Sequence, residues 1–291
     1  MRKLRLLSLT TLVLMFGAAC GSSGSGSLGG DEGGGVGNPL ALIAASADTT
    51  TEAGSAKTTM QMHMETPQGE VDMNADGAFN FDSKQGRMTM HMTVPGAPGP
   101  MDIEMVFENL VIYMKYPALA EIPGSKPWIS VDLEKLGEET GMDLGALTQG
   151  ANNDPSQALD YLRGVSDVEV VGEEEVRGAP ATHYKGEIDF DKVVSQAPAD
   201  LRERIKASID LLKDSIGGST IPVEVWIDEQ GRVVRMVQDM SFTEGAQKGS
   251  SMSMTAEFFD FGTPVKITIP PASQVMDLQE LMGGMGAGTA P

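Results

Sequence analysis

The sequence alternates between apolar and polar residues over long stretches, with a period of two. In the segment 60–65, three methionines fall on one side of a predicted strand, and Gln61, His63 and Glu65 fall on the other. Because successive side chains of a strand point to opposite faces, such segments predict an antiparallel meander with one apolar face. The same alternation predicts further strands over 71–81, 87–94, 101–107, 110–116 and 128–133.

A second group of strands is expected in the second half of the chain. One hairpin is predicted to turn at Arg177 and Gly178, and another at Asp228 to Gly231, because these residue types favour tight turns. The strands of this group are expected at 168–176, 182–190, 222–227, 232–243 and 250–261.

Helical periodicity precedes and separates the two groups of strands. Pro39 suits a first helical turn and Gly54 ends a predicted helix over 39–53. A second helix is expected over 199–216, where apolar residues recur every three or four positions before Gly217. The apolar stripe of the first helix comprises Leu40, Ile43, Ala44 and Ala47. Shorter helices are expected over 134–147, 154–163 and 274–282.

This order of elements predicts an α+β fold class. Strands from both ends of the chain are expected to form a single antiparallel sheet, with the helices packed on one of its faces. Long strands twist and coil, so the sheet is expected to curve strongly, with the helices covering the concave face.

The N-terminus has the layout of a secretory signal peptide. A basic start and a short apolar run over 6–16 lead to small residues and then to Cys20, the single cysteine. The apolar run is too short to span a bilayer. The string FGAAC resembles a bacterial lipobox, although Gly17 stands where leucine is usual, and it predicts lipidation of Cys20. Ordinary cleavage after Ala19 without lipidation is the alternative.

Glycine and serine dominate residues 21–38, which cannot bury enough apolar surface to fold. As a flexible coil this stretch would reach about 23 Å on average. The predicted organisation is therefore a signal peptide (1–19), a lipidated cysteine with its tether (20–38), one folded domain (39–282) and a loose tail (283–291). The domain is expected to be lipid-anchored to the cell membrane on its extracytoplasmic side.

The chain is strongly acidic, with 41 Asp and Glu residues against 21 Lys and Arg residues and a formal charge of −20. Loss of the three basic residues of the signal peptide lowers the net charge by three more, to −23. Such a charge argues against nucleic acid as a partner and against electrostatic docking on anionic lipid. Attachment to the cytoplasmic membrane is therefore expected through the Cys20 anchor.

The sequence contains no pattern typical of a catalytic, cofactor or metal site. It has neither a G-x-S-x-G elbow nor a dinucleotide or phosphate-loop fingerprint. His63, His91 and His183 lie on the polar sides of predicted strands, without metal-pair spacing, and are expected to be solvated. The acidic run Glu173 to Glu175 is expected to be a solvated edge. The sequence thus predicts no enzyme, no cofactor and no metal.

Methionine is unusually frequent, with 20 residues against nine Phe, four Tyr and two Trp. Because methionine is flexible and polarizable, a concave sheet lined by it could accept an acyl chain. Plain core packing under the helices is the alternative. The candidate lining residues are Met60, Met62, Met64, Met88, Met90, Met92, Ile103, Met105, Val225, Ile227, Met252 and Met254.

Three stretches are similar to the actinobacterial LppX/LprA/LprF/LprG lipoprotein family, namely KPWISVDLEKLG (126–137), DPSQALDYLRGVSDVEVVGEEEVRGAPATHYKGEIDF (154–190) and PVEVWIDEQGRVVRM (222–236). The resemblance spans residues 39–280. It implies a fold like that of the LolA/LolB carriers, in which a strongly curved antiparallel half-barrel is closed by helices. It further implies a cavity for acylated lipids or glycolipids, which such proteins help to move across the cell envelope. No individual binding residue is carried over.

Two functions therefore remain open at this stage. The first is a membrane-anchored module that binds, and moves, a lipid or acylated glycolipid, with a membrane exporter as a further candidate partner. The alternative is a ligand-free scaffold, sensor or docking lipoprotein of the envelope.

Overall fold

The computed structural model describes residues 38–93, 99–115, 124–133, 161–196 and 202–278, together with single residues between and after these ranges. Cys20, the tether, most of the helix predicted over 134–147 and the tail after residue 282 lie outside the described residues. The helix predicted over 154–163 is described only at its end, where residues Tyr161–Gly164 form the short 3-10 helix η2.

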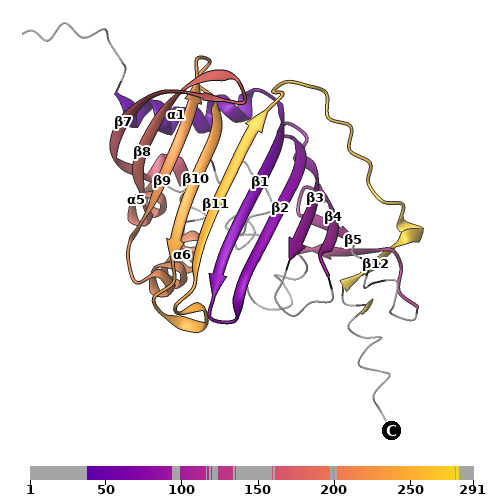
Figure 1. Ribbon diagram of the computed structural model, residues 1–291. Helices are drawn as coiled ribbons and strands as arrows, with labels where there is room; N and C mark the ends of the chain where they lie inside the picture. Colours follow the sequence, from indigo (N-terminus) through magenta and orange to yellow (C-terminus); the bar gives the residue numbers. More distant parts are fainter. Residues whose placement is uncertain are drawn as a thin grey trace, which may run out of the picture. The chain divides into compact units, whose positions relative to one another are not determined.

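The described strands form one sheet with the order β12-β6-β5-β4-β3-β2-β1-β11-β10-β9-β8-β7 (Figure 1). All neighbouring pairs are antiparallel except β12 and β6, which run parallel. The strands are β1 (Ser55–Thr66), β2 (Gly69–Asn80), β3 (Gln85–Thr93), β4 (Met101–Glu108), β5 (Val111–Lys115), β6 (Trp128–Asp132), β7 (Val165–Val176), β8 (Ala179–Asp189), β9 (Thr220–Asp228), β10 (Val233–Ser241), β11 (Ser251–Phe259) and β12 (Val275–Asp277).

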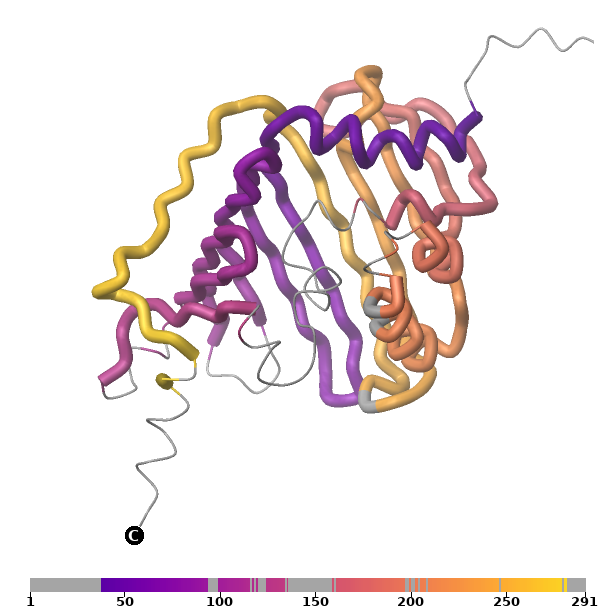
Figure 2. The backbone as a smooth tube through the Cα atoms, turned by 180° about the vertical axis from the view of Figure 1, so that it is seen from behind, coloured from indigo at the N-terminus to yellow at the C-terminus, as the bar shows by residue number. Residues whose placement is uncertain are grey.

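The predicted fold class is confirmed. β1, near the beginning of the described chain, pairs along its length with β11, near the end, so the sheet is built from both ends of the chain. The sheet curves, and the helices lie on its concave face, over the half that contains β7 to β11 (Figure 2). It is an open half-barrel, because among the described strands β7 and β12 form the two edges.

The two predicted hairpin turns are also confirmed. Arg177 and Gly178 join β7 to β8 with φ values of 53° and 80°, the left-handed conformations that suit a tight two-residue hairpin. Between β9 and β10, the Asp228 carboxylate accepts hydrogen bonds from the backbone N–H groups of Gln230 and Arg232. Asp228 therefore stabilises the turn through its side chain, and Gly231 adopts the left-handed conformation there, with a φ of 80°.

Helix α1 (Pro39–Glu52) begins where predicted, with the Asn38 side chain accepting a hydrogen bond from the Leu40 N–H. Its buried residues are Ile43, Ser46, Ala47 and Thr50. Leu40 was assigned to the apolar stripe but is 38% exposed. The buried face of the helix instead begins at Ile43 and extends to Thr50. The Thr50 hydroxyl accepts a hydrogen bond from the Val233 N–H at 2.8 Å, which holds the C-terminal part of the helix against β10.

Two more described helices lie on the concave face (Figure 2). Helix α5 (Phe190–Gln196) was not predicted separately; it follows β8 directly, and the Asp189 carboxylate accepts from the N–H groups of Asp191 and Lys192. Helix α6 (Arg202–Ile216) matches the prediction closely and ends at Gly217, whose φ is 69°. Its Ile209 is buried in the core. Among the described residues, η3 (Gly245–Gln247) and η4 (Ala272–Gln274) are further short helices.

The helix predicted over 274–282 is wrong at its start. Residues Val275–Asp277 form β12 instead, which pairs with the open edge of β6. The Lys126 ammonium donates a hydrogen bond to the Val275 carbonyl at 2.6 Å. Pairing with an available strand edge therefore outweighs the weak helical preference of this short segment.

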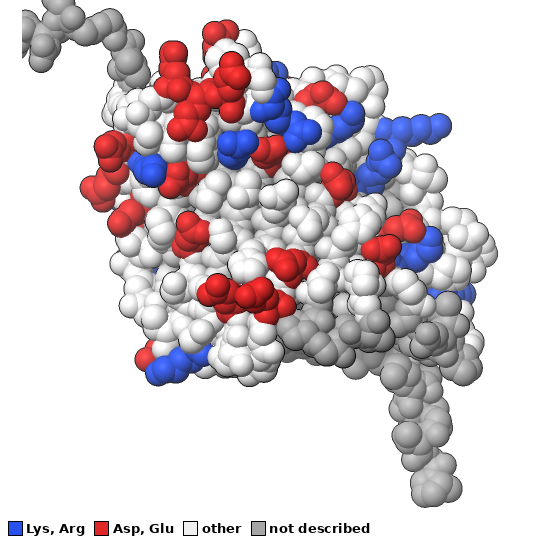
Figure 3. All heavy atoms as spheres, viewed as in Figure 1, with Lys and Arg blue, Asp and Glu red and all other residues white. Residues whose placement is uncertain are grey.

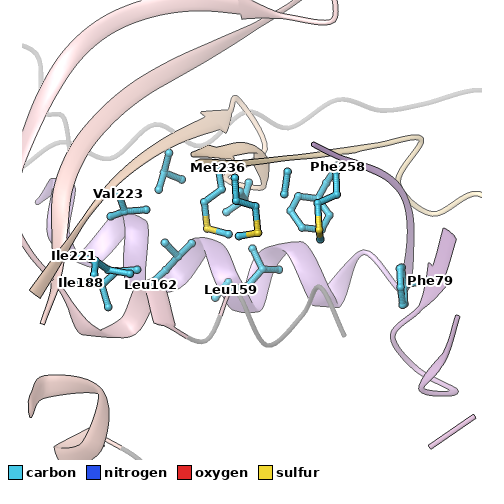
Figure 4. Packing of buried hydrophobic residues seen from close by; sticks show 14 of the residues in the cluster. Phe79, Leu159, Leu162, Ile188, Ile221, Val223, Met236 and Phe258 are labelled. Carbon is cyan, nitrogen blue, oxygen red and sulfur yellow. The ribbon is translucent and has the colours of Figure 1, made fainter. Parts of the chain in front are cut away.

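The main hydrophobic core lies between the concave face and the helices. Ile43 of α1, Phe190 of α5 and Ile209 of α6 belong to the same buried cluster as Met236 of β10 and Phe258 of β11. Figure 4 shows Met236, Val223 and Phe258 of the sheet above Leu159 and Leu162. The concave face is therefore the inner face of the molecule, and this face carries the candidate site.

Candidate functional site: the methionine-rich inner face

The register of the strands arranges the inner face in rows. Met60 of β1 pairs with Ala256 of β11 on one side and with Ala75 of β2 on the other. Because directly paired residues of neighbouring strands point to the same face, such pairs form continuous rows across the sheet. The row through Met60, from β8 to β4, is Tyr184, Val225, Met236, Ala256, Met60, Ala75, Met90 and Ile103.

The rows nearer the β1–β2 hairpin are richer in sulfur. The first of them runs across five neighbouring strands as Met254, Met62, Met73, Met92 and Met101. The next contains Met240, Met252 and Met64 in direct register. These rows lie at the end of β1 that is remote from α1 (Figure 1).

The structure places all twelve candidate lining residues on the inner face, where they split into two groups. Seven of them are buried and five are half-buried, and β1, β3 and β4 contribute to both groups. The buried group is Met60, Met88, Met105, Val225, Ile227, Met252 and Met254. The half-buried group is Met62, Met64, Met90, Met92 and Ile103. Whether either group contacts a lipid stays a prediction.

The candidate lining set leaves out further methionines of the same face, among them Met73, Met101, Met114, Met236 and Met240. Met73 and Met240 stand between polar residues, so a stricter use of the period of two could have found them. Met236 is fully buried, whereas Met101 is 39% exposed. The same residue type therefore serves both as core filling and as accessible surface on one face.

The inner positions of β1 to β4 and of β9 to β11 carry no Asp, Glu, Lys or Arg side chain. Three polar side chains interrupt this apolar surface, one of which is Thr66 at the end of β1. Gln238 of β10 is buried between Val223 and Met254 in register. Thr58 of β1 is 1% exposed, and its hydroxyl has no hydrogen-bond partner among the described residues.

The outer face has the opposite character. Figure 3 shows acidic and basic side chains interspersed on it. His63 lies 2.7 Å from Asp72, and His91 lies 2.7 Å from Asp102, each pair bridging neighbouring strands. The hydrogen bond to Asp72 raises the pKa of His63 above its ordinary value. Both histidines lie on the polar face, as the alternation predicted.

His183, by contrast, is not solvated as predicted, since it is only 4% exposed. Its ring stacks on Trp226 with centroids 4.0 Å apart, and its two nitrogens lie 3.0 Å from Glu174 and 2.7 Å from Glu224. The Trp226 indole donates to Glu174 at 2.8 Å. These bonds from Trp226 and His183 lower the pKa of Glu174. Glu174, within the acidic run on β7, therefore forms hydrogen bonds with both rings of the stacked His183–Trp226 pair.

The chemical repertoire of the inner face is that of a binding surface. In the part of the chain that the structure describes, no group of three or more His, Cys, Asp and Glu residues could hold a metal ion. Of the helices described there, none has the length and apolarity that crossing a membrane requires. The inner face offers thioether and aliphatic surface, with a carboxamide and two hydroxyls within it.

Comparison with curated proteins finds two relatives in Streptomyces, while no family model matches the chain. A 31.2 kDa protein encoded in the rplA–rplJ intergenic region of Streptomyces griseus is 29% identical over 244 residues, which cover 84% of this chain and 76% of that protein. A protein of Streptomyces coelicolor named "putative lipoprotein" is 29% identical over 172 residues. That match covers 58% of this chain and 48% of the relative, so the chain spans about half the length of that protein.

Solved structures similar to the chain include LprF from Mycobacterium bovis, with a TM-score of 0.44 and 18% identity. LppX from Mycobacterium tuberculosis has a TM-score of 0.43 and 15% identity. The matches cover 80% and 79% of this chain, and 97% of each mycobacterial chain. LprF and LppX are two of the proteins whose names define the lipoprotein family that the three sequence stretches resemble.

Proposed function

We propose that the chain is a lipoprotein, anchored through Cys20 on the extracytoplasmic side of the cell membrane, that binds an acyl chain of a lipid or acylated glycolipid. The inner face of the half-barrel is the binding surface, and its half-buried methionines contact the acyl chain. Transfer of the bound lipid to or from a membrane exporter extends the same role.

The observation that carries this proposal is the incomplete burial of an uncharged, methionine-rich surface. Met62, Met73 and Met92 follow one another across three strands and are all half-buried, and Met101 beside them is exposed. A contiguous apolar surface of this kind on a folded domain is typical of a binding site. Methionine side chains adapt to ligands of varied shape, which suits chains that differ in length or branching.

The energetics of acyl burial are sufficient without any catalytic or charged residue. Each buried methylene contributes about 0.8 kcal/mol, so a twelve-carbon chain contributes roughly 10 kcal/mol. Association itself costs at least about 4 kcal/mol. The difference leaves useful affinity even when part of the chain stays in contact with water.

The polar groups of the inner face favour an acylated ligand over a plain hydrocarbon. The Gln238 carboxamide and the Thr58 hydroxyl can donate hydrogen bonds to ester or sugar oxygens. A ligand that supplies an acceptor to Thr58 would remove the cost of a buried, unpaired hydroxyl. A lipid with ester or sugar oxygens next to its acyl chain matches both features.

The proposal is tested by titrating the purified full-length chain, in detergent, with a fluorescent fatty-acyl probe. Met62→Lys places a charge on the inner face, whereas Gln61→Lys places the same charge one residue away on the outer face. We expect saturable binding by the wild type and Gln61→Lys, and at least a tenfold loss in Met62→Lys. Absence of saturable binding by the wild type, or an equal loss in both variants, would contradict the proposal.

A further inference from the structure

Methionine side chains are concentrated at one place on the inner face, where β11, β1 and β2 lie side by side. Met62 and Met64 of β1 pair directly with Met254 and Met252 of β11. Met73 of β2 pairs with Met62 from the other side. These five residues, Met62, Met64, Met73, Met252 and Met254, are called the thioether cluster below.

Strand propensity does not explain this choice of residue. Valine, isoleucine and aromatic residues are the types that favour strands, and methionine is not among them. The helix-side half of the same face follows that rule, with Ile221, Val223, Val225 and Ile227 at the inner positions of β9. The cluster therefore carries a property that branched aliphatic residues lack, which is either flexibility or sulfur.

The spacing of the cluster suits a shared ligand. Directly paired residues of neighbouring strands have Cβ atoms about 4.5–5.5 Å apart. The methionine sulfur lies two bonds beyond Cβ on a side chain with three rotatable bonds, so sulfurs from paired residues can converge on one atom between them. Met62 has a paired methionine on each side, which brings three thioethers from three strands together.

Burial gives this convergence a protected interior and an accessible side. Met252 and Met254 are buried, whereas Met62, Met64 and Met73 are half-buried. The inner positions around the cluster carry no charged side chain that would recruit a hard cation such as Mg²⁺ or Ca²⁺. Thioethers are soft ligands that select Cu(I).

We propose that the thioether cluster is a binding site for Cu(I), with Met62, Met254 and Met73 as the central sulfur ligands and Met64 and Met252 beside them. The site goes beyond the lipid-binding role, because it uses the sulfur atoms of the inner face rather than its apolar surface. The two properties are separable, since leucine preserves volume and apolarity but removes the thioether.

The test is a competition titration of the purified full-length chain with Cu(I) against a colorimetric Cu(I) chelator under anaerobic, reducing conditions. All proteins carry Cys20→Ser, so that the single thiol does not compete for the metal. The test variant is Met62→Leu combined with Met64→Leu. The matched control is Met105→Leu combined with Met114→Leu, a directly paired set on the same face of β4 and β5.

We expect the parent protein to bind one Cu(I) per chain, the β1 variant to bind at least 100-fold more weakly, and the control to stay within threefold of the parent. X-ray absorption of the parent should show sulfur neighbours only. No competition by the parent, equal binding by the β1 variant, or nitrogen ligands from the outer-face histidines would each overturn the proposal.

The acyl-probe titration on the Cys20→Ser parent, run beside the Cu(I) titration, keeps the two proposals distinguishable. A parent protein that binds Cu(I) but no acyl probe would overturn only the lipid-binding role. A parent that binds the probe but no Cu(I) would overturn only the copper site.

Discussion

Replacing Met90 by tryptophan tests the lipid-binding surface at its middle. Met90 is half-buried and lies beside Ala75 and Ile103 in the row that crosses β2, β3 and β4. A tryptophan side chain exceeds methionine by roughly three methylene groups, each worth about 0.8 kcal/mol of acyl burial. If the ring occupies space that an acyl chain otherwise fills, binding weakens by about 2 kcal/mol, or roughly 30-fold.

The assay is the fluorescent acyl-probe titration, with a thermal melt to establish folding. Thr89→Trp is the matched control, because it adds a similar bulk on the neighbouring residue of β3, on the outer face opposite Asp76 and Glu104. Met90→Leu controls for loss of the methionine itself and should bind like wild type. The reasoning is refuted if Met90→Trp folds and binds the probe as tightly as wild type, or if Thr89→Trp is equally impaired.

Three further predictions concern the fold. The Thr58 hydroxyl is buried and has no hydrogen-bond partner among the described residues, so Thr58→Val should raise the free energy of unfolding by about 1 kcal/mol in a urea titration; a loss of stability would show that the hydroxyl has a partner. Met236→Ala opens a cavity at a fully buried site and should cost about 2–5 kcal/mol in the same titration, whereas a cost below 1 kcal/mol would contradict the packing described. Asp72→Asn should lower the pKa of His63, which an NMR titration measures. The substitution should lower the free energy of unfolding most at low pH, where His63 is charged, and this loss should disappear as the pH rises through the wild-type pKa of His63. An unchanged pKa of His63 would contradict the pairing with Asp72.

The alternation of residues was enough to predict the strands and which side of each is apolar. Met60 and Gln61 occupy opposite faces because a strand has a period of two, whatever its partners. A single sheet built from strands of both ends of the chain was also predicted, whereas the direct pairing of β1 with β11 is given only by the structure. The glycines and acidic residues at 177–178 and 228–231 fixed the hairpins locally.

The features that sequence reasoning missed depend on partners distant in the chain. Val275 joins a strand because the edge of β6 is open beside it, and nothing within 274–282 specifies that edge. His183 is buried because Trp226 and Glu224, about 40 residues away, lie on the adjacent strand. The thioether cluster arises from register alone, since Met62 and Met254 are neighbours only after β1 and β11 pair.

The central claim is that the methionine-rich inner face holds an acylated lipid. Native mass spectrometry of the full-length protein, extracted gently from the membranes of an actinobacterial host, tests it most directly. The account predicts a population heavier than the bare chain by the mass of an acylated lipid, and loss of that population in Met90→Trp but not in Thr89→Trp. A folded protein that is always found at the mass of the bare chain would contradict it and would favour a ligand-free envelope lipoprotein.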